Sequence, residues 1–179
     1  MLMVRPQHVT FETQNEQEEI ILLLRQHYIV NVGWIFATIV LGLIPTIVGP
    51  LLLTSKIVLT WMPSGYFIVL PLIWYLGVFG YALLNFLQWY FNVYIVTNER
   101  IVDVDWFNLL YKQLATTQLD KVQDVTFKQG GIADLFFNYG NVFIQTAGTE
   151  QNFEFVAVPH PDLVVREIDG LIEKREKAV

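Results

Sequence analysis

The fold is decided by the stretch Asn85-Phe-Leu-Gln-Trp-Tyr-Phe-Asn-Val-Tyr-Ile-Val-Thr-Asn-Glu-Arg-Ile101, in which a long apolar run ends and strand-like alternation begins. The chain before this stretch has the composition of a segment built for lipid. The chain after it alternates apolar and polar residues over short segments, as the strands of a small β-rich domain do. The stretch therefore predicts a joint between a membrane anchor and a folded domain at the bilayer surface.

Charged residues are distributed very unevenly along the chain. The 179 residues are 54% hydrophobic, yet no Asp, Glu, Lys or Arg occurs from Gln26 to Ser55 or from Ile57 to Asn98. A soluble core cannot use so much uncharged chain, whereas a helix that crosses a bilayer needs about 20 apolar residues. We therefore predict a transmembrane hairpin over residues 28–91, with helices at 28–53 and 66–91.

Small residues and prolines indicate how the two helices pack. Gly33 and Ala37 lie four residues apart on the first helix, and Gly77 and Gly80 lie on the second, so we expect close helix contact there. Pro45 and Pro50 are expected to kink or end the first helix. Membrane helices tolerate such prolines where neighbouring groups satisfy the carbonyls that they free.

Residues 1–27 are expected to form a tail and an interfacial helix. Asn15 is a typical cap residue, and Glu18 follows at the spacing of a capping box. The predicted helix continues through Ile20–Leu24 towards the first membrane span. The polar side chains expected to anchor its end at the lipid interface are Arg25 and His27.

The two predicted spans place both termini on the same side of the membrane. Positive charge next to the spans is Arg25 and Arg100 on that side, against Lys56 in the turn. Because positive residues favour the cytoplasmic side, the sequence predicts an integral protein of the plasma or inner membrane with both termini in the cytoplasm.

Residues 92–179 show the pattern of a compact β domain. A hairpin is predicted around Asn98-Glu99, and a C-terminal amphipathic helix opens at Pro161. Between them, strands are predicted at 111–117, 122–127, 142–146 and 153–158, with a helical turn at 132–137. The predicted fold class is thus an α+β membrane protein: a transmembrane helical hairpin followed by a pleckstrin-homology-like (PH-like) antiparallel β-barrel or sandwich with a C-terminal amphipathic helix.

Three segments that follow the two spans in sequence resemble segments of a known family. They are Tyr94-Ile-Val-Thr-Asn-Glu-Arg-Ile101, Leu119-Asp-Lys-Val-Gln-Asp-Val125 and Asn138-Tyr-Gly-Asn-Val-Phe-Ile-Gln-Thr-Ala-Gly148. Together they resemble the bacterial membrane-anchored PH-like proteins of the two-transmembrane-helix type, over about Ile20 to Ile172. The resemblance implies a PH-like fold carried on a transmembrane hairpin, and it implies no particular reaction.

Composition argues against several functions. The net charge of −6 leaves no dense cationic face for nucleic acid. Four cations, Arg100, Lys112, Lys121 and Lys128, stand against more carboxylates in the β domain, which argues against phosphoinositide binding. Arg100 is expected to pair with a carboxylate such as Asp124. No nucleophile stands beside an oriented base, and no metal-ligand spacing or phosphate loop occurs, so we expect no enzyme, no cofactor and no metal.

A polar stripe marks the membrane end of the second span. Asn85, Gln88 and Asn92 share one helical face, and Asn31 lies on the first span. Such a face could line an ion path, but it more often forms hydrogen bonds to a partner helix or to interfacial water. We favour the second interpretation because no ionisable group lies in mid-span.

Apolar residues in predicted loops indicate a candidate interaction surface. They are Trp106, Phe107, Leu109, Leu110, Phe136 and Phe137. They pack under the domain, against lipid, or into a partner. The sequence thus predicts a non-enzymatic, membrane-anchored PH-like module for protein association at the cytoplasmic face, as a homo-oligomer or with another protein. The alternatives are a small pore or transporter subunit that uses the polar stripe, and a lipid-binding module.

Overall fold

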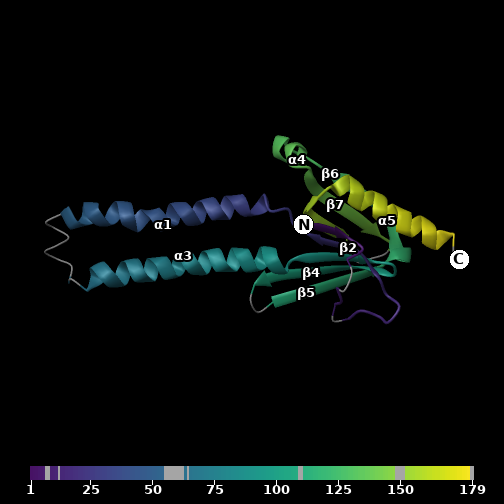
Figure 1. Cartoon of the computed structure of the whole chain (residues 1–179), viewed down its shortest axis with the longest axis horizontal. Helices are drawn as coiled ribbons and strands as arrows, with labels where there is room; N and C mark the ends of the chain where they lie inside the picture. The colour runs from purple at the N-terminus through teal and green to yellow at the C-terminus, as the bar shows by residue number, and fades with distance from the viewer. Residues whose placement is uncertain are drawn as a thin grey trace. The chain divides into compact units, whose positions relative to one another are not determined.

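The computed structural model divides the chain into two compact units (Figure 1). The β unit comprises Met1–Val30 and Gln88–Val179, and the helical unit comprises Asn31–Leu87. The structure describes residues 1–6, 9–11, 13–54, 63, 65–108, 111–147 and 152–177, with the backbone alone at 106–108, 111, 112 and 176. The N-terminal segment therefore belongs to the same unit as the domain that follows the hairpin.

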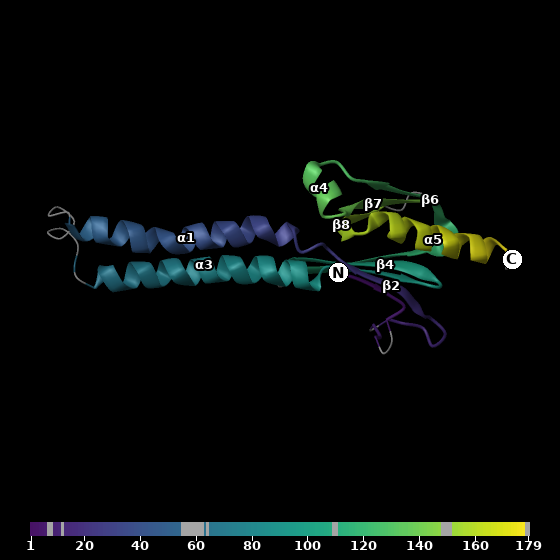
Figure 2. The ribbon, with the colours of Figure 1, turned by 45° about the horizontal axis from the view of Figure 1, so that its top comes forward.

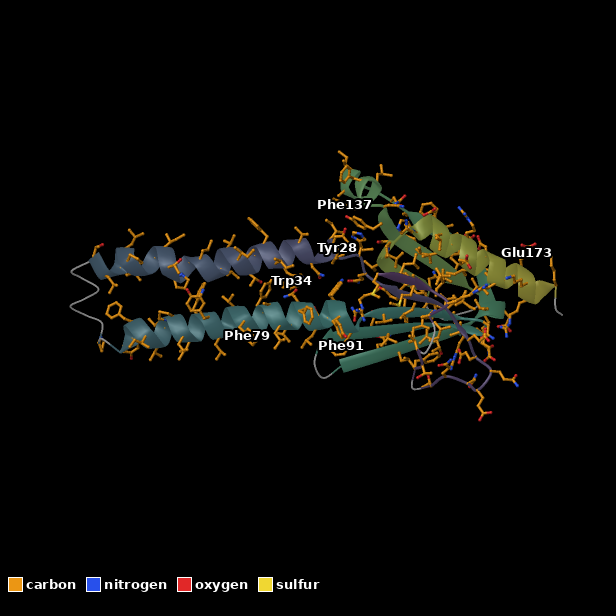
Figure 3. All side chains as sticks on the ribbon, in the orientation of Figure 1. Tyr28, Trp34, Phe79, Phe91, Phe137 and Glu173 are labelled. Atoms are coloured by element: carbon orange, nitrogen blue, oxygen red, sulfur yellow. The ribbon has the colours of Figure 1, made fainter. Side chains whose placement is uncertain are left out.

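Two long helices make up the hairpin. Helix α1 covers Val30–Thr54 and helix α3 covers Tyr66–Phe91. Both are long and apolar enough to cross a membrane, and the most apolar stretch of each is entirely unburied. They run side by side (Figures 1 and 2), and their side chains stand out along both helices (Figure 3). The two predicted spans are thus present as helices of the expected length.

One hydrogen bond explains how α1 tolerates a proline. In a regular helix the N–H of residue 45 would bond to the carbonyl of Leu41, but Pro45 has no N–H. The indole Nε1–H of Trp74, on α3, donates to this carbonyl oxygen at 2.9 Å. The neighbouring helix therefore satisfies the freed carbonyl, as the sequence predicted.

The glycines of the hairpin do not have the predicted role. A Cβ atom built on Gly33, Gly42, Gly77 or Gly80 would meet nothing within 4 Å. These positions therefore do not bring α1 and α3 into close contact, and the prediction that they do is wrong. The glycines leave shallow, open surface on each helix instead.

The β unit contains two antiparallel sheets. Sheet A has the order β1-β2-β3-β4-β5, and sheet B has the order β6-β7-β8. The strands of sheet A are Leu2–Val4, Ile20–Arg25, Val93–Thr97, Arg100–Asn108 and Tyr111–Gln118; those of sheet B are Val122–Lys128, Tyr139–Thr146 and Phe153–Pro159. Two separate sheets make a sandwich rather than a closed barrel. The six strands after the hairpin were all predicted from short strand-like runs of residues.

Two helices and a short turn complete the β unit. The 3₁₀ turn Leu119–Lys121 joins β5 to β6, and α4 (Ile132–Phe136) lies between β6 and β7. Helix α5 (Pro161–Glu176) lies along β6 and β7 (Figure 2). Its apolar residues Val164 and Ile168 are fully buried, so the predicted amphipathic helix is confirmed.

The core of the β unit lies between the two sheets and α5. Leu22 and Tyr94 come from sheet A, Phe155 comes from sheet B, and Ile168 comes from α5. The rings of Tyr94 and Phe155 stack with centroids 4.4 Å apart. Each of these side chains is at most 2% exposed, so they exclude water from the interior.

The predicted interfacial helix at Ile20–Leu24 is wrong. These residues form strand β2, which pairs with β1 on one side and β3 on the other. The run Ile-Ile-Leu-Leu-Leu is apolar on both faces because both faces of β2 are covered, and such a run has no periodicity that separates strand from helix. The predicted reciprocal contact exists, since the Asn15 N–H donates to Glu18 at 3.0 Å, but it closes a turn and no helix follows.

Arg100 pairs with Glu18 rather than with Asp124. The Glu18 carboxylate is fully buried and accepts from Nε and Nη2 of Arg100, each at 2.9 Å. The hydroxyl of Thr97 donates to the same carboxylate at 2.8 Å. The pairing with Asp124 was wrong because Asp124 lies on sheet B, whereas Glu18 precedes the strand next to β3.

Candidate functional site

At one end of the β unit, the chain leaves for the hairpin and later returns from it. Strand β2 ends at Arg25, which pairs with Val93 at the start of β3. The Arg25 guanidinium lies 4.5 Å from the centroid of the Tyr90 ring, and the Trp89 indole N–H donates to the Gln26 carbonyl at 3.1 Å. We call this the crossing end of the β unit, because both connections to the helices lie here.

His27 lies at the crossing end, but not as the exposed anchor that the sequence predicted. It is only 7% exposed, and its ring stacks on Tyr139 with centroids 5.3 Å apart. Its backbone N–H donates to the Ala157 carbonyl at 2.7 Å. Burial lowers the pKa of His27 below its ordinary value, so the ring is neutral at pH 7 and serves as packing.

The most exposed apolar side chains of the β unit lie on α4. Ile132 is 90% exposed, Leu135 68% and Phe136 81%. They are spaced i, i+3, i+4 and therefore share one face of this short helix. The next residue, Phe137, is 40% exposed, and its ring lies 6.5 Å from His27. The rings of Tyr28 and Phe137 lie at the same end of the β unit (Figure 3). Helix α4 is thus part of the crossing end.

The second predicted apolar segment approaches the same end through strand register. Val93, the first residue of β3, pairs with Val104 of β4. Strand β4 continues past this pair to Asn108, with Trp106 paired to Lys112 of β5. The backbone of Trp106 and Phe107 therefore extends beyond the start of β3, towards the crossing end. Leu109 and Leu110, also predicted for this surface, lie outside the described residues.

One residue of the α4 surface was not identified from the sequence. Phe136 and Phe137 were predicted as candidates, and Leu135 precedes them in the same apolar run, but Ile132 was assigned only to the predicted helical turn. The i, i+3, i+4 spacing within Ile132–Phe136 was the available signal.

Two residues of the polar stripe, Asn31 and Asn85, form hydrogen bonds within their own helices. The Asn31 side-chain oxygen accepts from the Trp34 indole N–H at 3.0 Å. The Asn85 amide donates to the Tyr81 carbonyl at 2.8 Å, one turn back on α3. These two asparagines therefore satisfy their side chains locally. That Gln88 and Asn92 act with them remains a prediction.

A pair of carboxylates occupies the core-facing side of β4. Asp103 is 8% exposed and pairs across strands with Tyr94. Burial, together with the charge of Asp105, raises the pKa of Asp103 to about 7, and burial also raises the pKa of Asp105. Burial raises the pKa of Tyr94 to about 12, and its hydroxyl accepts from the Val156 N–H at 3.2 Å. Asp103 is thus a half-protonated acid near pH 7 beside a neutral phenol.

The Asp103 carboxylate is short of hydrogen-bond partners. Its Oδ1 atom has none within the described part of the chain, and no His lies on its strand pair. Among the described residues, no group of three His, Cys, Asp or Glu could hold a metal ion. The geometry supports an effect of Asp103 on stability.

Two of the four cations of the β unit have described contacts within the fold. Arg100 is bound by Glu18 at the far end of β3, and the Lys128 ammonium lies 4.9 Å over the Phe143 ring. Reading a phosphorylated headgroup takes several cations aimed at one point. Two of the four candidate cations therefore contact other side chains of the fold.

Comparison with known proteins agrees with the architecture. The family described as Bacterial PH domain matches residues 27–172, which include both helices of the hairpin and β3 to α5 up to Ile172. Neither the comparison with curated proteins nor that with solved structures finds a match. Because the family match covers most of the chain, this protein belongs to the bacterial PH domain family.

Proposed function

We propose that this chain is a non-enzymatic, membrane-anchored PH-like module that associates with protein at the cytoplasmic face of the membrane. Family membership supports a non-enzymatic module, since PH domains are generally binding modules without catalytic activity. Helices α1 and α3 support the anchor, because each has the length and apolar surface of a membrane span. Neither helix has a folded layer around it that would bury this surface.

The free edge of sheet A carries the proposal of protein association. Strand β5 is the last strand of sheet A and is hydrogen-bonded to β4 alone. An edge strand presents unpaired backbone N–H and C=O groups, to which a strand of another chain can add. At eight residues β5 is the longest edge strand, whereas the opposite edge, β1, has three.

From Gln113 onwards, β5 lacks the features that protect an edge. Its one charged residue, Lys112, and the irregularity in its pairing with β4 lie before this point. Proteins protect exposed edges with charges, prolines or bulges. Edge strand β6 carries Asp124, Lys128 and an irregular register next to Val122. In contrast, β5 has no charge and no proline from Gln113 to Gln118, and its Leu114 is 45% exposed. Strand β5 is therefore the edge best suited to strand addition.

A second copy of this chain is the simplest partner for β5. Two antiparallel β5 strands related by a two-fold axis would extend sheet A across both copies, and such self-complementary contacts are the commonest in oligomers. A different protein that offers one extended segment would use the same backbone groups. In both cases, the proposed protein association occurs through strand β5.

The mass of the purified complex tests this proposal. The full chain, taken from its own membranes in mild detergent, is expected to run as a complex larger than one chain of 20.7 kDa. Leu114→Lys with Thr116→Lys puts charge on the edge and is expected to release single chains. The matched control is Gln145→Lys, an exposed position on the central strand β7. A monomeric wild type, or an edge variant that keeps its complex, would contradict the proposal.

Membrane topology has a separate test, since the chain contains no cysteine. Single cysteines at Thr54, the last residue of α1, and at Glu173, on α5, provide two reporters. An impermeant thiol reagent applied to intact cells should label Thr54→Cys and not Glu173→Cys. Labelling of Glu173→Cys from outside contradicts cytoplasmic termini.

A further inference from the structure

Helix α4 combines a small size with an unusual surface. Its residues are Ile-Ala-Asp-Leu-Phe, and the three large apolar ones are between 68% and 90% exposed. A folded domain rarely leaves a contiguous apolar cluster in water unless it contacts something else. The cluster formed by Ile132, Leu135 and Phe136 therefore needs an occupant.

The polar groups of α4 are directed back into the β unit. Asp134, the only charged residue of the helix, accepts the Gly130 N–H at 2.9 Å, and this bond together with one from the Tyr139 hydroxyl lowers the pKa of its carboxyl. The side-chain amide of Gln129 donates to the Tyr139 carbonyl at 3.1 Å. Polar contacts thus fix the base of α4, while its apolar side chains face outward.

The position of α4 identifies the occupant. Phe137, directly after α4, packs near His27, and α1 begins at Val30. Tyr28, between them in sequence, is 63% exposed. Helix α4 lies at one end of sheet B rather than on its face (Figures 1 and 2). If the hairpin crosses a membrane, the end of the β unit that connects to it lies at the bilayer surface, so an apolar tip at this end meets lipid first.

The charge of α4 determines which lipid interaction is available. The helix carries no Lys or Arg, and the whole chain is net negative, so anionic headgroups provide no attraction. Burial of apolar side chains at the boundary between headgroups and acyl chains needs no charge. The surface therefore fits the interface of a bilayer independently of its anionic content.

We propose that α4, at the crossing end of the β unit, inserts Ile132, Leu135 and Phe136 into the membrane interface, and so holds the β unit against the lipid surface. This proposal rests on the membrane anchor of the proposed function. Insertion gives the β unit a third attachment to the membrane, besides its two covalent connections to the hairpin. The face presented to other proteins is then fixed rather than free to turn.

The test uses the full chain reconstituted in vesicles of neutral phosphatidylcholine. Single cysteines replace Phe136, Ile132, Glu173 and Leu43, and each carries an environment-sensitive fluorophore. Spin-labelled lipids quench fluorophores within the bilayer, and iodide quenches those in water. Labels at Phe136→Cys and Ile132→Cys are expected to be quenched several-fold more by the lipid than the label at Glu173→Cys, and several-fold less by iodide.

The label at Leu43, an exposed residue in the middle of α1, distinguishes the insertion of α4 from the membrane anchor itself. Lipid quenching at Leu43 but not at Phe136 or Ile132 overturns the insertion of α4 and leaves the anchor intact. No lipid quenching at Leu43 contradicts the anchor itself. Protection of Phe136 and Ile132 from both quenchers overturns lipid insertion, since it places protein over α4. Quenching that requires added anionic lipid contradicts the apolar mechanism.

Discussion

The two units of this chain use the same apolar side chains in opposite ways. In the β unit, Leu22 and Phe155 are fully buried between two sheets. In the helical unit, Leu76 is 69% exposed and Phe79 is 63% exposed. Hydrophobic composition therefore does not determine burial here. Under the proposed membrane anchor, what differs is the solvent around each unit, since lipid accepts the apolar surface that water rejects.

The two units also differ in how their polar groups are satisfied. The β unit buries Glu18 and Asp103, and the first is compensated by Arg100. The helical unit keeps Asn85 bonded to its own helix and uses Trp74 to satisfy one backbone carbonyl. The β unit thus supports a buried ion pair, whereas the hydrogen bonds described for the helical unit join neutral groups.

The largest expected effect separates the two units directly. Phe155→Ala removes a fully buried ring and should lower the free energy of unfolding of the β unit by about 3–5 kcal/mol. Phe79→Ala removes the same atoms from an exposed position and should change it by less than about 0.5 kcal/mol. Urea unfolding of the full chain in detergent, followed by β-sheet circular dichroism, measures both. Equal losses would mean that Phe79 is packed as a core residue is.

A second test concerns the buried ion pair of the β unit. Glu18→Ala leaves the Arg100 guanidinium without its partner and should cost about 3 kcal/mol. Burial alone would raise the pKa of Glu18, but hydrogen bonds from Arg100, Asn15 and Thr97 outweigh it and hold the pKa below the ordinary 4.5. The stabilisation is thus present above about pH 4.5 and is lost as pH falls through the folded-state pKa.

Glu18→Gln is the matched variant for this test. It keeps the shape and some of the hydrogen bonds, so its loss at pH 7 should be smaller than that of Glu18→Ala. Its stability should not share the loss that the wild type shows below about pH 4.5, because the amide does not titrate. An identical acid response in wild type and Glu18→Gln would show that other carboxylates dominate.

A third test predicts a gain in stability. The pKa of Asp103 is raised to about 7, so its unfolded form ionises first and stability is lost as pH rises from about 4 to about 7. Asp103→Asn removes this loss and should raise the free energy of unfolding at pH 8 by on the order of 2 kcal/mol. The exposed Asp120→Asn is the control and should be neutral. A flat wild-type profile between pH 4 and 7 would contradict the assignment.

The smallest effect is expected in the helical unit. Trp74→Phe removes the hydrogen bond to the Leu41 carbonyl and should cost about 1 kcal/mol. In a Pro45→Ala background the restored N–H of residue 45 can bond to this carbonyl, so the same substitution should cost less. Unfolding in mixed detergent micelles, followed by helical circular dichroism, gives the coupling energy. Additive losses would show that the two residues act independently.

The periodic parts of the fold could be predicted from the sequence. The uncharged runs predicted α1 and α3, and short strand-like runs bounded by turn residues predicted β3 to β8. Strand β2 could not be recognised, since Ile20–Arg25 is covered on both sides and its partner β3 lies beyond the whole hairpin. The pairing of Glu18 with Arg100 was hidden for the same reason. Long-range contacts leave no local pattern.

The candidate surface could be predicted only in part. Phe136 and Phe137 were identified because apolar residues in a loop are conspicuous. Their position near His27 depends on how sheet B meets the N-terminal segment, which no spacing encodes. The free edge at β5 likewise follows from the strand order and not from the residues of β5 themselves.

The pairing of β2 with β3 imposes an order on biosynthesis. Arg25 emerges from the ribosome before the hairpin and Val93 after it, so sheet A cannot form until both helices have been made. In an anchored chain, β3 returns to the side of the membrane that holds β2 only when both spans have inserted. A chain with one span outside the bilayer separates the two strands and leaves the apolar β2 open to proteases. In such an anchored chain, sheet A can therefore be completed only after both spans have inserted.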